Sequence, residues 1–316
     1  MESVLMYVWL LVGFVLLIKG ADFFVDGSSS IARLLKVPSI VVGLTIVAMG
    51  TSAPELAVSV SAALKGSNDI VISNVLGSNM FNLLVVAGGC AVIKNLPVSK
   101  DLKKRDFPFS ILVAVLLLVF CASGFRIGRA EGGIMFALLI AYLIYLVFAA
   151  MKNRTGDVEG EEIKVMSPLM SIIFTIVGAA AIVLGGDLVV DSAEAIAHQW
   201  GLSDVIIGLT ILAVGTSLPE LVTSLVATRK GENDLAMGNV IGSNIFNILG
   251  VAGLSGAISP YAVSGLSVID LCLFIGFSVM VYLVVALRNK IERAPGIVRV
   301  LMYAAYMVYA VLREIM

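Results

Sequence analysis

Two glutamates in matching short motifs are the residues of this chain best placed to do chemistry. Glu55 ends the motif GTSAPE, and Glu220 ends the motif GTSLPE. Each glutamate falls inside a long apolar segment, where an uncompensated carboxylate costs about 2.5 kcal/mol or more in a membrane. An apolar segment has no packing reason to keep such a residue. The pair therefore indicates a path for cations through a membrane.

The residues around the glutamates add neutral oxygen donors. Hydroxyl residues stand within one turn before each glutamate, and the next apolar segment of each half reads GSNMFN or GSNIFN. In these segments a serine and an asparagine lie four positions apart, on one face of a helix. Carboxylate, hydroxyl and amide oxygens are the ligands that Ca²⁺ requires, and similar but less charged sites satisfy Na⁺. The candidate donors are Thr51, Ser52, Ser78 and Asn82 in the first half and Thr216, Ser217, Ser243 and Asn247 in the second.

A proline in each motif adds a backbone contribution. Pro54 and Pro219 each remove a helical hydrogen bond, so we expect carbonyl groups about one turn earlier to be released. Ala48 and Ala213 stand near those positions. Irregular backbone at membrane depth is tolerated only inside protein or beside a wet cavity, which is consistent with a site there.

The composition predicts helices that hold these residues within a membrane. The chain is 59% hydrophobic and 14% charged, and its mean hydropathy is +1.05. Its apolar runs are about 20 residues long, enough to cross a bilayer as helices, and they lack the alternation of a membrane barrel. The fold class we predict is an all-α polytopic membrane protein with ten transmembrane helices. The predicted spans are 4–25, 39–64, 70–93, 107–125, 131–150, 167–192, 204–228, 234–257, 266–287 and 297–313.

The spans fall into two copies of one unit. A shift of 165 positions aligns Gly20–Gly88 with Gly185–Gly253 without a gap, and about half of the pairs are identical. Each copy holds five predicted spans, so the second must enter the membrane from the opposite side, as inverted repeats do. We expect a first repeat at 1–150, a cytoplasmic linker at 151–166 and a second repeat at 167–316.

The basic residues predict the orientation. With the N-terminus outside, 16 Lys and Arg residues fall in cytoplasmic loops and 4 in outer loops. Because Lys and Arg concentrate on the cytoplasmic side, we expect both termini to be extracytoplasmic and the protein to reside in the cell membrane.

Other residues with chemical potential are less specific. Asp22, Asp26, Asp187 and Asp191 stand at span ends, where carboxylates can reach water or line a cation entrance, and both interpretations stay open. Three cysteines in separate spans favour packed free thiols, and a single His198 excludes a zinc-protease motif. The sequence holds no P-loop motif, and we expect no cofactor, nucleotide or nucleic-acid partner and no enzymatic activity.

The motif pairs GTSAPE with GSNMFN, and GTSLPE with GSNIFN, resemble the two conserved repeats of the cation/Ca²⁺ exchanger superfamily. The resemblance covers nearly the whole chain and is strongest to the compact prokaryotic Na⁺/Ca²⁺ exchangers. It implies two inverted five-helix halves around central cation sites, with the first and sixth helices sliding as a gate. It also implies central ligands at Glu55 and Glu220. The surrounding Na⁺ and Ca²⁺ ligands implied by the resemblance are Ala48, Thr51, Ser52, Ser78, Asn82, Ala213, Thr216, Ser217 and Ser243.

The resemblance has one departure and leaves rivals open. Some members, including K⁺-dependent ones, carry Asp where this chain has Asn247, so the neutral amide favours K⁺-independent exchange. A H⁺/Ca²⁺ antiporter is the nearest alternative, because the same glutamates could carry protons. A passive cation channel and an intramembrane protease, suggested by the GGD at Gly185–Asp187, are weaker alternatives.

Overall fold

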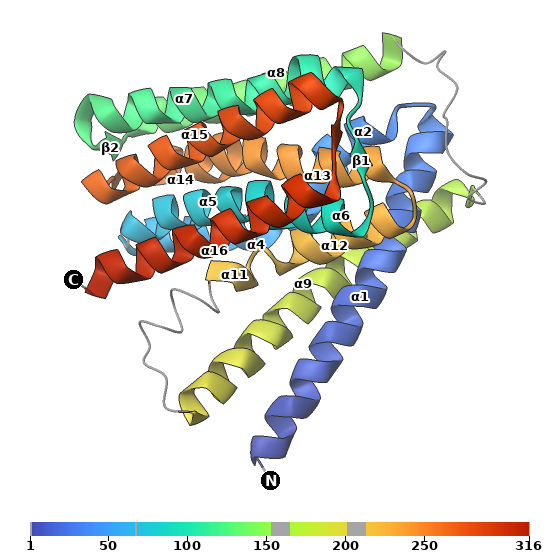
Figure 1. Cartoon of the computed structure of the whole chain (residues 1–316), viewed down its shortest axis with the longest axis horizontal. Helices are drawn as coiled ribbons and strands as arrows, with labels where there is room; N and C mark the ends of the chain where they lie inside the picture. The colour runs from blue at the N-terminus through green and yellow to red at the C-terminus, as the bar shows by residue number, and fades with distance from the viewer. Residues whose placement is uncertain (1, 67, 153–164, 201–212, 316) are drawn as a thin grey trace.

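The computed structural model describes residues 2–66, 68–152, 165–200 and 213–315, and within them the chain is almost entirely helical (Figure 1). The elements up to residue 152 are α1 (Glu2–Leu35), α2 (Ser39–Val42), η1 (Gly43–Val47), α3 (Ala48–Thr51), α4 (Ala53–Lys65), α5 (Asn68–Phe81), η2 (Asn82–Val86), α6 (Ala87–Ile93), β1 (Leu96–Pro97), η3 (Leu102–Asp106), α7 (Phe107–Gly124), β2 (Arg126–Ile127) and α8 (Arg129–Lys152). The later elements are α9 (Pro168–Gln199), α11 (Ala213–Gly215), α12 (Leu218–Arg229), α13 (Asn233–Phe246), η5 (Asn247–Ala252), α14 (Gly253–Ile258), β3 (Tyr261–Ala262), α15 (Gly265–Arg288), β4 (Lys290–Ile291) and α16 (Arg293–Ile315). The η elements are π-helical segments.

Most of the predicted spans correspond to these helices. Among the described residues, eight helices are long and apolar enough to cross a membrane. The pair Ser39–Thr51 and Ala53–Lys65, bent by 49°, gives a ninth if it is counted as one span. The predicted span 204–228 begins outside the described residues, and α11 and α12 form its described part. Likewise most of the predicted linker, 153–164, lies outside them.

Two predicted span ends were wrong. The first span was predicted to end at 25, but α1 continues to Leu35, and the sixth was predicted to end at 192, but α9 continues to Gln199. Hydropathy ends a span where polar residues begin, whereas helical hydrogen bonds continue as long as the polar side chains find water or a partner. In α1 the polar continuation has such partners, because Asp26 pairs with Lys230 and Arg33 pairs with Glu232.

Close glycine packing joins α1 to α9, and the two helices lie side by side at an angle to the other helices (Figure 1). Glycines of α1 face α9 at every seventh position. A Cβ added at Gly20 would lie 3.0 Å from the Gly178 carbonyl oxygen, and one added at Gly27 would lie 2.6 Å from the Thr175 nitrogen. Near the other end Gly13 faces Gly185. Partner numbers fall as α1 numbers rise, so the helices are antiparallel with their backbones in contact.

The centre of the molecule is formed by two equivalent helical rods. One combines α5, η2 and α6, and the other combines α13, η5 and α14. The most apolar windows of these rods are 72% and 83% buried, compared with 17–33% in the other long spans. Because the outer helices cover them, polar side chains on the rods are shielded from lipid, which is the condition that a charged site in a membrane requires.

Two short antiparallel strand pairs connect the halves. In one sheet Leu96 of β1 pairs with Ile291 of β4, and in the other Ile127 of β2 pairs with Tyr261 of β3. The two sheets lie at opposite ends of the helices (Figure 1). Each sheet takes one strand from residues before 152 and one from residues after 165, so the two halves interlock at both ends.

The described cysteines form no disulfide. Cys90 and Cys121 are buried, as expected of packed thiols, whereas Cys272 is exposed on α15. The exposed thiol lies on a helix of which only 33% of the apolar window is buried. Its position is therefore on the outer surface of the helix bundle rather than in the interior.

Candidate cation site

The glutamates begin helices that follow matching breaks. The helical path is interrupted at Ser52, with φ −87° and ψ 12°, and at Ser217, with φ −93° and ψ 4°. A proline in the first turn then starts α4 and α12, because proline fixes φ and needs no helical N–H partner there. Glu55 and Glu220 consequently lie in the first turn of their helices, at the positive end of the helix dipole.

Each glutamate is contacted by the serine of the opposite motif. Ser52 Oγ donates to Glu220 Oε1 at 2.7 Å, and Ser217 Oγ lies 3.4 Å from Glu55 Oε1. All four residues have 0% of their surface exposed. The motifs therefore meet face to face, and their carboxylates lie in one enclosed polar region built by both halves.

The central rods supply the next pair of contacts. Ser78 Oγ donates to Glu55 Oε1 at 3.1 Å, and Ser243 Oγ lies 3.5 Å from Glu220 Oε1. Both serines are buried. The motifs predict these serines as donors, and the structure brings them to the glutamates of their own halves.

Several acceptor oxygens at this place have no hydrogen-bond partner among the described residues. They are Oε2 of both glutamates and the side-chain oxygens of Asn82 and Asn247. All four residues are completely buried. Buried acceptors normally find a donor, so oxygens without one are in the chemical condition of ligands for a cation. The donor set is all oxygen, which suits Ca²⁺ or Na⁺.

A π-helical turn begins at each of the two asparagines. Asn82 is the first residue of η2, and Asn247 is the first residue of η5. Such turns insert an extra residue per turn, re-aim the side chains and occur often at functional sites. The Asn247 amide group donates to Ser78 Oγ and to Asn79 Oδ1, each at 3.1 Å. That donation turns its oxygen away from these partners and leaves it as an acceptor.

The expected release of a carbonyl is not seen at Ala48, but Ala48 as a cation ligand stays a prediction, because a carbonyl oxygen with one hydrogen bond keeps a second lone pair. The Ala48 carbonyl accepts a hydrogen bond from the Ser52 N–H at 3.0 Å, so it is not released, because proline removes only its own N–H. In the other motif the Ser217 N–H bonds to Val214 at 3.1 Å. Ala213 begins α11, and its side chain lies outside the described residues.

The threonines differ between the motifs. Thr51 is completely buried, and its hydroxyl lies 3.0 Å from Asn239 Oδ1 and 3.1 Å from the Val47 carbonyl oxygen. Thr216 is partly buried at the turn between α11 and α12. Thr51 therefore reaches a rod of the opposite half.

Sequence reasoning missed two asparagines that support the glutamates. Asn74 Nδ2 donates to the Glu55 carbonyl at 3.1 Å and to Ser59 Oγ at 2.9 Å. Asn239 Nδ2 lies 3.5 Å from the Glu220 carbonyl and 2.9 Å from Ser224 Oγ. Each asparagine and the serine that it contacts recur in the other half at the same 165-position shift as the motifs. This recurrence could have identified them from the sequence.

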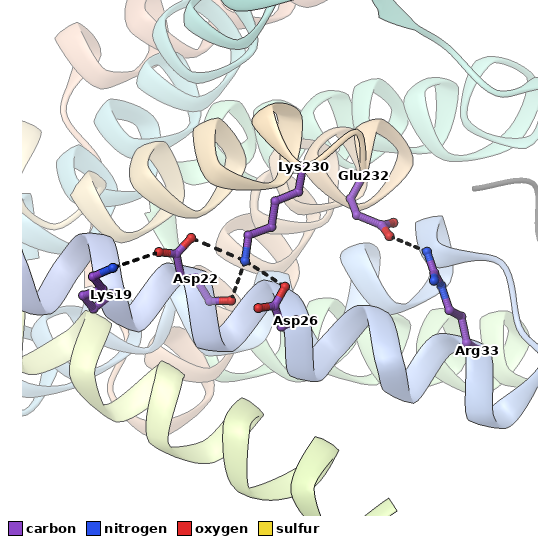
Figure 2. A network of polar contacts seen from close by, with 6 residues as sticks. All are labelled: Lys19, Asp22, Asp26, Arg33, Lys230 and Glu232. Atoms are coloured by element: carbon purple, nitrogen blue, oxygen red, sulfur yellow. Dashed lines mark hydrogen bonds and ion pairs between the residues drawn. The ribbon is translucent and has the colours of Figure 1, made fainter. Parts of the chain in front are cut away.

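The four aspartates near the span ends have different surroundings. Asp22 and Asp26 both contact Lys230, so a lysine balances their charge (Figure 2). Asp187 and Asp191 are exposed on α9. None of them has a contact with Glu55 or Glu220 among the described interactions, so the structure gives no support to a place inside the site.

Comparisons with known proteins give the family. The family model described as sodium/calcium exchanger protein matches residues 5–150 and 170–312. A relative from Alkalimonas amylolytica, named putative antiporter CaxA, is 39% identical over 308 residues, which is 95% of this chain and 96% of the relative. The sodium/calcium exchanger MaX1 of Methanosarcina acetivorans is 35% identical, over 95% of this chain and 96% of its own.

A solved structure has the same fold. The sodium-calcium exchanger NCX_Mj, soaked without Na⁺ and Ca²⁺, superposes with a TM-score of 0.85 at 31% identity. The superposition covers 98% of this chain and 99% of NCX_Mj. The resemblance seen in the motifs thus extends over the whole length of sequence and fold. This multi-pass membrane protein belongs to the sodium/calcium exchanger family.

Proposed function

We propose that the chain is a Na⁺/Ca²⁺ antiporter that works by alternating access. The proposal rests on the pair of buried glutamates. Each is contacted by a serine of the other motif, and each has one carboxylate oxygen without a hydrogen-bond partner in the described part of the chain. Two carboxylates balance the charge of one Ca²⁺, and the neutral oxygens around them complete a hard-cation site. The residues we assign to the site are Glu55, Glu220, Thr51, Thr216, Ser52, Ser217, Ser78, Ser243, Asn82, Asn247, Ala48 and Ala213.

Competition for one set of ligands would produce exchange. Ca²⁺ or several Na⁺ neutralise the glutamates, and the occupied protein can then reorient. An empty site would carry two uncompensated charges in a low-dielectric interior, which is costly and resists the transition. Na⁺ entering down its gradient therefore expels Ca²⁺. Unequal charge movement makes the exchange sensitive to voltage.

The architecture we propose is ten transmembrane helices in two inverted repeats, 1–150 and 167–316, joined by a cytoplasmic linker at 151–166. Three observations support it. The contacts of Ser52 with Glu220 and of Ser217 with Glu55 are equivalent. The first helices of the halves, α1 and α9, are antiparallel. Each of the two strand pairs joins one strand from each half, and the two pairs lie at opposite ends of the molecule (Figure 1).

Both termini are proposed to be extracytoplasmic, in the cell membrane. The biased loops support this, because Arg33, near the C-terminal end of α1, and Lys230, directly after α12, both stand in predicted cytoplasmic loops. A fusion of alkaline phosphatase to Met316 tests the orientation in a bacterial host. We expect an active phosphatase, since the enzyme folds only outside the cytoplasm, and an inactive one at a fusion after Lys152. The reverse pattern would overturn the orientation.

Exchange is further proposed to be independent of K⁺, because Asn247 places a neutral amide where a further carboxylate would attract another cation. The alternative is H⁺/Ca²⁺ antiport through the same glutamates. The hydroxyl contacts of Ser52 and Ser78 to the glutamates favour Na⁺ over a proton, because a proton needs no shell of neutral oxygens.

The test is uptake of radioactive Ca²⁺ by proteoliposomes loaded with Na⁺. We expect uptake that requires internal Na⁺, is unchanged by K⁺, and is abolished in Glu220→Gln. Gly77→Ala serves as a control, because an added Cβ there meets nothing within 4 Å. Uptake driven by a pH gradient alone would select the H⁺-coupled alternative, and uptake without any counter-ion would indicate a channel.

A further inference from the structure

A lysine at the end of α12 holds both aspartates of α1. Lys230 Nζ lies 2.7 Å from Asp26 Oδ1, 3.4 Å from Asp22 Oδ1 and 3.0 Å from the Asp22 carbonyl oxygen (Figure 2). The three side chains are 26–36% exposed. One cation therefore bridges two acids that stand one turn apart on the same helix, and it fixes α1 against the end of α12.

A second ion pair ties the same two parts of the molecule together. Arg33 Nη2, near the C-terminal end of α1, lies 3.0 Å from Glu232 Oε1, just before α13 (Figure 2). These side chains are only 13% and 9% exposed. Lys19 is a peripheral member of the network, because its side chain is 68% exposed and lies 3.9 Å from Asp22.

The repeat supplies the same charges at the other end of the molecule. A shift of 165 positions carries Asp22, Asp26 and Lys230 onto Asp187, Asp191 and Lys65. Among the described residues, however, no ion pair joins Lys65 to either aspartate, and all three are exposed. The helix packing also differs between the two ends. Helix α1 packs along α12, whereas the equivalent helices, α9 and α4, have much less contact with each other.

The helices that carry the aspartates also cover the broken helices of the cation site. Phe24 of α1 packs on Gly50, where an added Cβ would lie 2.8 Å from its ring. In the other half Val190 of α9 packs on Gly215. Both helices expose large apolar side chains on their remaining surface, so lipid borders them there. A joint shift of α1 and α9 would therefore change the cover over both motifs.

We propose that Lys230 and Lys65 are alternating positioning residues of the transport cycle. Lys230 holds Asp22 and Asp26 in the conformation described here. In the opposite-facing conformation α9 packs on α4 as α1 now packs on α12, and Lys65 takes Asp187 and Asp191. The two ion-pair sets exclude one another, because α1 and α9 are joined backbone to backbone and move together. The inference rests on the proposed alternating access of the antiporter.

The sequence makes the ion pairs around Lys230 different from those expected around Lys65. Arg33 and Glu232 correspond to His198 and Ser67, which offer no matching pair of opposite full charges. The Arg33–Glu232 pair joins α1 to the start of α13, whereas His198 lies 3.6 Å from Glu194 of its own helix, so the end that carries Lys230 has the additional pair between helices. The conformation held by Lys230 should accordingly be the more populated one when no cation gradient is present.

Disulfide formation between the unpaired positions tests the proposal without measuring ion flux. The double variant Lys65→Cys/Asp191→Cys is made in a chain whose Cys90, Cys121 and Cys272 are replaced by alanine. It is purified into lipid nanodiscs and oxidised with copper phenanthroline. We expect a disulfide, because the opposite conformation brings the two positions together. Adding Lys230→Gln should raise the rate of disulfide formation by about fivefold, which is the effect of losing a partly exposed ion pair worth about 1 kcal/mol.

Controls separate the charge contact from a change in folding. Lys230→Arg keeps the cation and should leave the rate within about twofold of the parent, as should Lys19→Gln at the exposed margin. Asp22→Asn/Asp26→Asn removes the acids instead of the lysine and should repeat the effect of Lys230→Gln. It also serves as the decisive variant if Lys230→Gln fails to fold.

Two results would overturn the proposal. One is the absence of a disulfide between positions 65 and 191 in every background. The other is a disulfide whose rate is the same with Lys230, with Lys230→Gln and with the double asparagine variant. The disulfide rate reports the positions of the helices and not the transported ion. If the disulfides form as expected but Na⁺-coupled Ca²⁺ uptake is absent, only the proposed Na⁺/Ca²⁺ exchange is refuted. Normal uptake with no charge-dependent disulfide would refute only the alternating ion pairs.

Discussion

The two equivalent serines of the cation site should contribute unequally to Ca²⁺ binding. Ser52 Oγ lies 2.7 Å from a carboxylate oxygen of Glu220, whereas Ser217 Oγ lies 3.4 Å from Glu55 and 2.9 Å from Ser78 Oγ. A hydroxyl has one proton to donate. Ser217 therefore gives its proton to the nearer Ser78, and Ser52 gives its own to the carboxylate.

The structure sets the size of the difference. A buried hydrogen bond to a charged group contributes about 1.5–3 kcal/mol, and a neutral one about 0.5–1.5 kcal/mol. We expect Ser52 to hold the Glu220 carboxylate in place when Ca²⁺ is bound as well. Since about 1.4 kcal/mol is tenfold in an equilibrium constant, losing that contact in Ser52→Ala should raise the half-saturating Ca²⁺ concentration about 10- to 100-fold. Ser217→Ala should raise it about 2- to 10-fold by the same conversion.

The assay is initial Ca²⁺ uptake into Na⁺-loaded proteoliposomes over a range of external Ca²⁺. Ser123→Ala is the matched control, because this serine is exposed and its one hydrogen bond among the described residues goes to the Phe120 carbonyl at 2.9 Å. Equal effects of Ser52→Ala and Ser217→Ala, or an unchanged half-saturating concentration in Ser52→Ala, would refute the reasoning from hydrogen-bond geometry.

Three further predictions follow from other contacts. Gly178→Ala should lower the midpoint of thermal unfolding by several degrees, because a Cβ at position 178 would lie 2.7 Å from the Phe24 Cα. Gly77→Ala should leave the midpoint unchanged, and size-exclusion chromatography after heating measures both variants. Asn247→Asp should create a K⁺ requirement for Ca²⁺ uptake. Unchanged uptake without K⁺ would contradict the proposal that the Asn247 amide makes exchange independent of K⁺. Asn74→Ala should reduce the maximal uptake rate without loss of expression, because its amide fixes the Glu55 carbonyl at 3.1 Å; wild-type rates would contradict that role.

The approximate positions of most spans, and the residues that meet around the two glutamates, could be predicted from sequence. A polar residue is costly within a membrane, so Glu55 and Ser78 can be recognised by residue type in their apolar segments, and both are buried in the structure. The repeat also predicts equivalent partners. It does not predict that Ser52 would contact the glutamate of the other half, because that requires knowing how the halves face one another.

Other features depended on tertiary contacts that no local pattern encodes. The extension of α1 to Leu35 depends on Lys230 and Glu232, which stand about 200 positions later. The continued hydrogen bond of the Ala48 carbonyl depends on the turn at Ser52. The unequal packing of α1 and α9 was not predicted, because the matched motifs give the same expected contacts to both halves.

The most direct test of the central claim is Ca²⁺ uptake with the two glutamates compared one at a time. Glu55→Gln and Glu220→Gln, which keep the shape of the side chain and remove its charge, are assayed beside Gly77→Ala in Na⁺-loaded proteoliposomes. If both carboxylates hold one divalent ion, each substitution alone abolishes Na⁺-dependent uptake while the control retains it. Na⁺-dependent uptake that survives in either glutamine variant would contradict the account of a single site shared by the two halves.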